Sequence, residues 1–101
     1  MEGGTLAKYV IPVNYTEQGI AKMKDSRERL QAVRASIEEA GGKMESFYLT
    51  LGQYDAVSIV DVPDYATLAT LLLKTAANGN VRTSTLRAFD ETEYVRIIDA
   101  L

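Results

Sequence analysis

A hairpin in the middle of the chain, within residues 43–61, constrains the fold more than any other stretch. Large apolar side chains alternate with Tyr and Thr between Phe47 and Leu51, which is typical of a strand with two different faces. Gly52–Asp55 then forms the turn, because Gly tolerates positive φ and Asp bonds to backbone N–H groups in turns. β-branched residues resume over 56–60. We therefore predict two antiparallel strands joined by a tight turn.

Strand patterns also occur near both ends of the chain. A nearly continuous apolar run predicts a first strand at residues 6–13. Pro12 cannot donate a ladder hydrogen bond, so we expect it near the strand end or facing an unpaired side. Thr16 is expected to cap a short helical turn that follows this strand. High β-branched content predicts a fourth strand at residues 81–89.

Longer helices are predicted where apolar residues recur with the helical period. Asp25 and Glu28 have capping-box spacing at the start of the first, and Asp64 is the expected N-cap of the second. Asp90 and Glu93 form another capping box at the start of the last helix. That helix carries an apolar stripe and must pack on something; the stripe consists of Tyr94, Ile97, Ile98 and Leu101.

The predicted order is β-α-β-β-α-β-α in a single domain, residues 1–101. Its first six elements predict an α+β, ferredoxin-like fold: a four-stranded antiparallel sheet with helices on one face, followed by the additional C-terminal helix. Apolar side chains point to both faces of the strands, so the sheet face without helices is too apolar to be fully exposed to solvent. We expect a second subunit to cover it, sheet against sheet, as in a dimeric α/β barrel. The alternative is that the C-terminal helix covers the open face of its own subunit.

Composition excludes several kinds of chemistry. The chain has neither cysteine nor histidine, which removes disulfides, thiolate sites, imidazole bases and the commonest metal ligands. We expect no metal and no cofactor. The net charge is −3 with scattered basic residues, so nucleic acid is not an expected partner. Residues 1–5 lack the pattern of a signal peptide, and no apolar run is long enough for a membrane span, so we expect a cytoplasmic protein without membrane contact.

Three segments together resemble the GYD domain family: Tyr9–Tyr15, Phe47–Val57 and Gly79–Phe89. The turn Gly52-Gln53-Tyr54-Asp55 is the feature that names that family. The resemblance covers nearly the whole chain. It implies a small domain without an established activity, related to the dimeric α/β barrels, a group that includes cofactor-free oxygenases and isomerases. It supports the fold and the sheet-to-sheet dimer, and it assigns no catalytic residue.

The hairpin turn is the first candidate site. Tyr54 and Asp55 bring a phenol and a carboxylate to the tip, where they could polarise a small ligand or exchange a proton. The alternative, which we favour, is turn chemistry: Asp55 bonds the loop backbone and Tyr54 packs over the hairpin.

Tyrosines and an arginine supply the other candidates. Six tyrosines against two phenylalanines is an unusual ratio for a core, so Asn14, Tyr15 and Tyr48 could contact a flat organic ligand. The alternative is a moderately polar dimer interface, where Tyr is enriched. Arg82 and Arg87 could anchor an anion, although pairing with carboxylates across the sheet or across subunits is favoured because acids outnumber bases.

The sequence leaves two main function classes open, and a purely structural oligomer is a third, weaker option. The expected partners are a second copy of the chain and a small organic ligand. The first is a dimeric or larger small-ligand-binding or regulatory module. The second is a cofactor-free enzyme, oxygenase- or isomerase-like, in which Tyr, Asn, Asp or Arg stabilise charge. A pocket between the helices and the sheet, lined by Tyr, Asn and Arg, would favour the interpretations that use a ligand.

Overall fold

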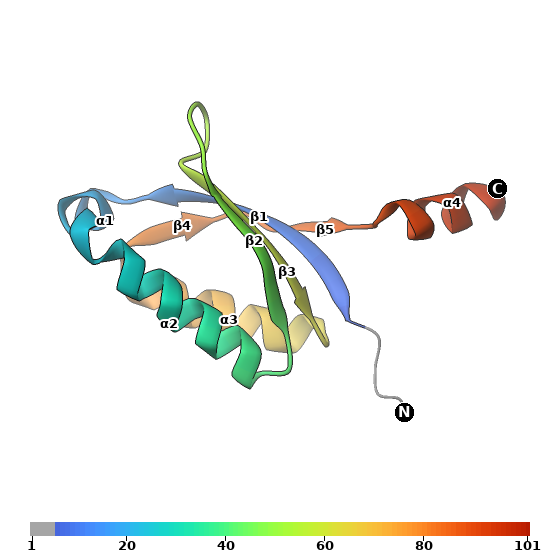
Figure 1. The fold of residues 1–101 in the computed structure, drawn as a ribbon, viewed down its shortest axis with the longest axis horizontal. Coiled ribbons are helices and arrows are strands. Elements are labelled where there is room, and N and C mark those ends of the chain that lie inside the picture. The colour runs from blue at the N-terminus through green and yellow to red at the C-terminus, as the bar shows by residue number, and fades with distance from the viewer. Residues whose placement is uncertain (1–5) are drawn as a thin grey trace.

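Two long helices cover one face of an antiparallel sheet, and a further helix stands away from both (Figure 1). The structure, a computed structural model, describes residues 6–101, so the prediction about a signal peptide at residues 1–5 lies outside the described part. The elements in chain order are β1 (Ala7–Tyr15), α1 (Glu17–Ala21), the 3-10 turn η1 (Met23–Asp25), α2 (Ser26–Glu39), β2 (Lys43–Leu49), β3 (Ala56–Val62), α3 (Tyr65–Ala77), β4 (Val81–Thr83), β5 (Leu86–Ala88) and α4 (Glu91–Asp99).

The strands lie in the order β2-β3-β1-β4, and β5 also pairs with β1. All pairs are antiparallel, with Tyr9 opposite Val60 and Val13 opposite Ala56 at the centre of the sheet. The predicted α+β class, with helices on one face of an antiparallel sheet, is confirmed.

The single fourth strand predicted at 81–89 is instead two short strands, β4 and β5, and β1 continues beyond Val13 to Tyr15. Both short strands follow one register along β1, and the break between them lies opposite Pro12. The Ser84 N–H donates to the Pro12 carbonyl at 3.0 Å, but proline has no N–H to return the bond. The ladder is therefore interrupted inside the sheet. Pro12 does not lie at the strand end, but it faces an unpaired position, the other alternative that the sequence allowed.

Most predicted caps are confirmed. The Thr16 hydroxyl accepts from Gly19 N–H, the Asp64 carboxylate accepts from Thr67 N–H, and Asp90 with Glu93 forms a complete capping box. The capping box predicted at Asp25 is wrong, because that side chain makes no capping bond. Asp25 closes η1 with φ −91° and ψ −1°, and a capping residue needs extended backbone.

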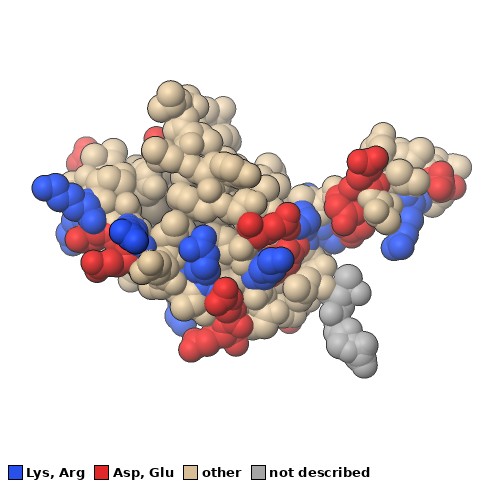
Figure 2. All heavy atoms as spheres, in the orientation of Figure 1, with Lys and Arg blue, Asp and Glu red and all other residues tan. Residues whose placement is uncertain are grey.

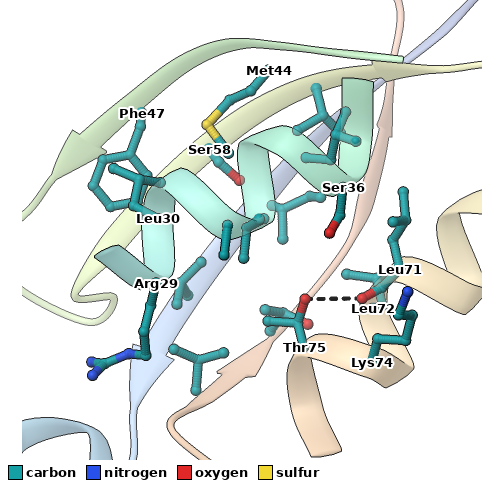
Figure 3. A pocket seen from close by; sticks show the side chains of 18 of the residues that line it. Arg29, Leu30, Ser36, Met44, Phe47, Ser58, Leu71, Leu72, Lys74 and Thr75 are labelled. Atoms are coloured by element: carbon teal, nitrogen blue, oxygen red, sulfur yellow. Dashed lines mark hydrogen bonds between the residues drawn. The ribbon is translucent and has the colours of Figure 1, made fainter. Parts of the chain in front are cut away.

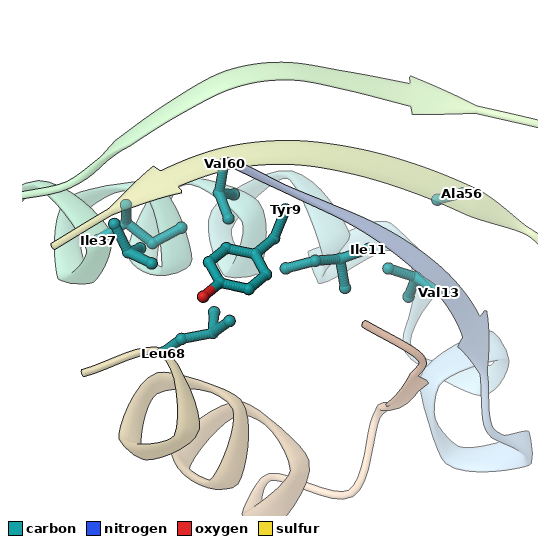
Figure 4. Close-up of a cluster of buried hydrophobic side chains, with 8 residues drawn as sticks. Tyr9, Ile11, Val13, Ile37, Ala56, Val60 and Leu68 are labelled. Carbon is teal, nitrogen blue, oxygen red and sulfur yellow. The ribbon is translucent and has the colours of Figure 1, made fainter. Parts of the chain in front are cut away.

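The core lies between the sheet and the two long helices (Figure 4). Alternate residues of β1 and β3 point toward the helices, as the period of a strand requires. Ile37 of α2 and Leu68 of α3 meet them. The strand residues of this hydrophobic core are Tyr9, Ile11, Val13, Ala56, Val60 and Val62.

The short helix α1 is locked against the loop that precedes β4. A Cβ at Gly19 would lie 2.0 Å from the Asn80 carbonyl oxygen, so only glycine fits this approach. The Thr16 N–H donates to the same Asn80 carbonyl at 3.0 Å. This contact fixes the end of β1 relative to β4.

Helix α4 does not cover the open face of its own sheet. It projects from the end of β5, away from α2 and α3, and lengthens the molecule to 48 Å (Figure 1). The apolar stripe predicted for this helix is exposed along its whole length; it comprises Tyr94, Ile97, Ile98 and Leu101.

Candidate functional site

The Gly-x-Tyr-Asp turn is pinned to the end of β1. The Asp55 carboxylate accepts from the Tyr15 N–H at 2.9 Å, and the Asp55 N–H donates to the Val13 carbonyl at 2.9 Å. Inside the turn, the Thr50 hydroxyl donates to the Tyr54 carbonyl at 2.6 Å, and Gly52 has a φ of +109°. These bonds fix the conformation of the turn and its angle to the sheet.

The pinned turn presents an apolar tip to solvent. Leu51 is 98% exposed and Leu49 is 73% exposed, although both are large aliphatic residues. The tip rises above the rest of the molecule (Figure 1), and the corresponding part of Figure 2 shows no Lys, Arg, Asp or Glu. An aliphatic, uncharged projection of this kind is typical of surfaces that contact another protein.

The predicted site residues do not form one cluster. Asn14 and Arg82 are directly paired across β1 and β4, so both side chains point to the same face of the sheet. Tyr48 pairs with Val57, which in turn pairs with Pro12, so its 58% exposed ring lies on that same open face. Tyr15 has the opposite phase and lines a cavity on the helix side. Tyr54 and Asp55 lie in the turn.

A cavity of about 520 Å³ separates α2 and α3 above the helix-facing side of the sheet (Figure 3). Its walls are aliphatic and aromatic, including Leu30, Leu72 and Phe47. Among the described residues that line it, the charged ones are Arg27, Arg29 and Lys74, and no carboxylate is among them. We call this cavity with its cationic rim the α2/α3 groove. A ligand or protein segment with an apolar body and an anionic flank would be complementary to this groove in polarity and charge.

A pocket between the helices and the sheet was expected to favour a ligand, but the sequence did not predict that the pocket exists or that its rim is cationic. The signal was present as Arg27 beside the apolar stripe of the first long helix and Lys74 beside that of the second. The sequence did not show that α2 and α3 splay apart, because that distance is set by packing on the sheet.

The open face of the sheet has an apolar middle and polar ends. Its middle contains Val10, Val57, Ile59, Tyr48 and Leu86, the last 56% exposed. At one end Lys8 is paired with Glu45, and with Asp61 at 3.0 Å. The hydrogen bond to Glu45 raises the pKa of Lys8 and lowers that of Glu45. This end of the face is therefore an ion cluster of one lysine and two carboxylates.

Arg87 holds the start of α4 to the sheet. Its guanidinium lies 4.5 Å from the centre of the Phe89 ring and 5.7 Å from that of Tyr9. It also pairs with Glu93 at 3.6 Å and donates to the carbonyls of Lys8 and Ala88. The sequence favoured a carboxylate across the sheet or across subunits, whereas Arg87 pairs with a carboxylate of the helix that follows its own strand.

Two further observations concern residues 6–101. No group of three His, Cys, Asp or Glu side chains is placed to hold a metal ion over that range. None of the helices described there combines the length and the apolar character that crossing a membrane would need.

Solved structures define the class of fold. MtbAldR superposes with a TM-score of 0.67 at 16% identity over 85% of this chain, which spans only 55% of that protein. TTHA0845 from Thermus thermophilus superposes with a TM-score of 0.51 at 24% identity, covering 82% of this chain and 92% of that one. At such identities the likeness shows the fold alone: an α+β domain of the ferredoxin-like type.

Sequence comparison then gives the family. The model of the GYD domain matches residues 9–98, so the chain belongs to the GYD domain family. A relative from Thermus thermophilus, the glutamine synthetase and cystathionine beta-lyase binding protein, is 30% identical over 88 residues, which are 86% of this chain and 93% of that protein.

Proposed function

We propose that this GYD domain is a non-catalytic module that binds a metabolic enzyme through the tip of its central hairpin. The observation that carries the proposal is the exposed Leu51 on a turn that Asp55 and Thr50 hold rigid. A preformed apolar projection loses little conformational entropy on binding, so its burial contributes directly to affinity. The name of the Thermus relative, which describes binding to two enzymes, supports the same class of function.

The proposal includes a homodimer in which two open faces pack together. An apolar middle flanked by polar ends is the anatomy of a protein interface. Lys8, Asn14 and Arg82 lie at the ends of the face, outside the apolar middle. Sheet-to-sheet pairing would leave the hairpin tips free to contact a partner, as in the dimeric α/β barrels that the sequence suggested.

A small organic ligand in the α2/α3 groove is the second candidate function, and the cavity volume of about 520 Å³ favours it. Its cationic rim would anchor an acidic head group beside an apolar body. The cofactor-free enzyme would have to use the same space. The polar groups available to such an enzyme in the groove include Tyr15 and the three cations of the rim.

Direct binding to purified enzymes tests the first proposal. Immobilised chain is titrated with glutamine synthetase and, separately, with cystathionine beta-lyase, and biolayer interferometry records association. The expected result is saturable binding of at least one enzyme that Leu51→Asp weakens by tenfold or more, on the order of 1.4 kcal/mol. Leu73→Asp is the matched control, since Leu73 is also highly exposed but lies on α3. Equal loss in both variants, or no binding of either enzyme by the unaltered chain, contradicts the proposal.

A further inference from the structure

Helix α4 and the α2/α3 groove are complementary in shape and in charge. Helix α4 is an acidic amphipathic helix without a packing partner among the described residues, and the α2/α3 groove is an apolar cavity with a cationic rim. We propose that α4 of one molecule docks in the α2/α3 groove of a second copy of the same chain.

The shape of α4 suits such a groove. With about 100° of rotation per residue, Tyr94, Ile97 and Ile98 fall on one side of the helix. Glu91 and Glu93 lie on the two flanks of that stripe. The helix therefore presents an apolar ridge between two carboxylates, which is the helix-in-groove mode of recognition.

The charges of the groove complement those flanks. Arg27 and Arg29 lie on the α2 wall and Lys74 on the α3 wall, so cations border the groove on both sides. Part of the guanidinium of Arg29 is engaged, because it donates to the Lys22 carbonyl at 2.8 Å. Glu93 is also engaged, because it pairs with Arg87 at 3.6 Å and caps its own helix. Arg27 and Lys74 are therefore the principal counterparts for Glu91 of the arriving helix.

The groove of the same molecule is out of reach for α4. Only Phe89 and Asp90 separate β5 from α4, and Arg87 fixes this junction through Phe89 and Glu93. Figure 1 shows α4 pointing away from α2 and α3. Folding back would break the Arg87 contacts, whereas a second copy brings an unchanged groove to the helix.

A second copy of the chain is a sufficient partner, because every molecule carries both the apolar ridge of α4 and the α2/α3 groove. Two copies that exchange helices reciprocally form a closed assembly. The groove lies on the helix side of the sheet, so this contact leaves the open face free for the sheet-to-sheet dimer. Both contacts together would give assemblies larger than a dimer.

Disulfide trapping between two differently tagged copies tests the docking. The natural sequence has no cysteine, so only the introduced cysteines can form the bond. One preparation carries Ile97→Cys in the ridge, and a differently tagged one carries Leu72→Cys in the groove. Mixing under mild oxidation is expected to give a covalent heterodimer, because a disulfide needs the two Cα atoms within about 7 Å. Thr92→Cys, on the polar side of α4, is the matched control and is expected to lose this product.

Several results would overturn the docking. Equal heterodimer yields from Ile97→Cys and Thr92→Cys, or none from either, are incompatible with it. So is an intrachain disulfide in a monomeric Ile97→Cys/Leu72→Cys double variant, which would place α4 in its own groove. Sedimentation velocity gives an independent check: Ile97→Asp, at an exposed position, is expected to reduce the assembly mass, and an unchanged mass contradicts the proposal.

Discussion

The carboxylate of Asp55 accepts a 2.9 Å hydrogen bond from the backbone N–H of Tyr15, although the two residues are 40 positions apart. Of the two interpretations given to this aspartate, the contact agrees more with a structural one. The acceptor bonds the end of β1 and not the loop in which it lies. The Asp of the Gly-x-Tyr-Asp turn thus connects the central hairpin to the first strand.

Removing this carboxylate should loosen the hairpin. We expect Asp55→Ala to lower the free energy of unfolding by about 1.5–3 kcal/mol, the usual range for a hydrogen bond to a charged group. Asp55→Asn keeps an acceptor oxygen and should lose less. Urea denaturation followed by circular dichroism measures both, and equal losses for the two variants would argue against the hydrogen bond as the cause.

The Tyr9 hydroxyl is a buried polar group without a hydrogen-bond partner among the described residues. The side chain is only 3% exposed, and burial raises its pKa. Leaving such a group unsatisfied costs about 1–3 kcal/mol. Tyr9→Phe should therefore raise the free energy of unfolding by about 1 kcal/mol, with the ring contact to Tyr65 retained. A destabilised Tyr9→Phe variant in thermal denaturation would show that the hydroxyl has a favourable role.

The ion cluster at Lys8 predicts a pH dependence of stability. The pKa of Glu45 is lowered in the folded state by its hydrogen bond to Lys8, so its contribution is present above about pH 4.5 and disappears as the pH falls through the folded value. The pKa of Lys8 is raised, so its contribution is lost only as the pH rises through a value above 10.5. Glu45→Gln should consequently be less stable than the unaltered chain at neutral pH and approach it in acid. A difference that is constant across an acid titration of urea stability would contradict this assignment.

Gly19 has to be glycine because of the Asn80 carbonyl. Gly19→Ala places a methyl group where the backbone oxygen lies at 2.0 Å, so α1 must move away from the loop before β4. We expect a loss of about 1–3 kcal/mol, as for an overpacked core, despite the better helix propensity of alanine. Ile20→Ala, at an exposed position of the same helix, is the control and should change stability by less than about 0.5 kcal/mol. A stabilised Gly19→Ala would mean that α1 is not held against this loop.

Local patterns in the sequence predicted most elements of the fold, whereas contacts between elements remained out of reach. The caps at Thr16, Asp64 and Asp90 depend on neighbouring residues only, so spacing was enough to find them. The break between β4 and β5 depends on Pro12, far earlier in the chain, and required knowledge of the register.

The same reason explains what was missed around the candidate site. A register shift between Met44 and Ser46 lets Met44 and Phe47 both pack on the core, although an odd spacing puts residues of a regular strand on opposite faces. Tyr48 therefore lies on the open face, apart from Tyr15 on the helix side. The sequence identified the residue types but not the faces on which they meet.

We propose that the domain acts by presenting the apolar tip at Leu51 to an enzyme. Isothermal titration calorimetry of the chain with glutamine synthetase and cystathionine beta-lyase, at several temperatures, measures this contact. We expect saturable binding to at least one of them with a negative heat-capacity change, since apolar surface is buried, and a loss of that binding in Leu51→Asp. Binding that Leu51→Asp leaves unchanged, or no heat of binding with either enzyme at any temperature, would contradict it.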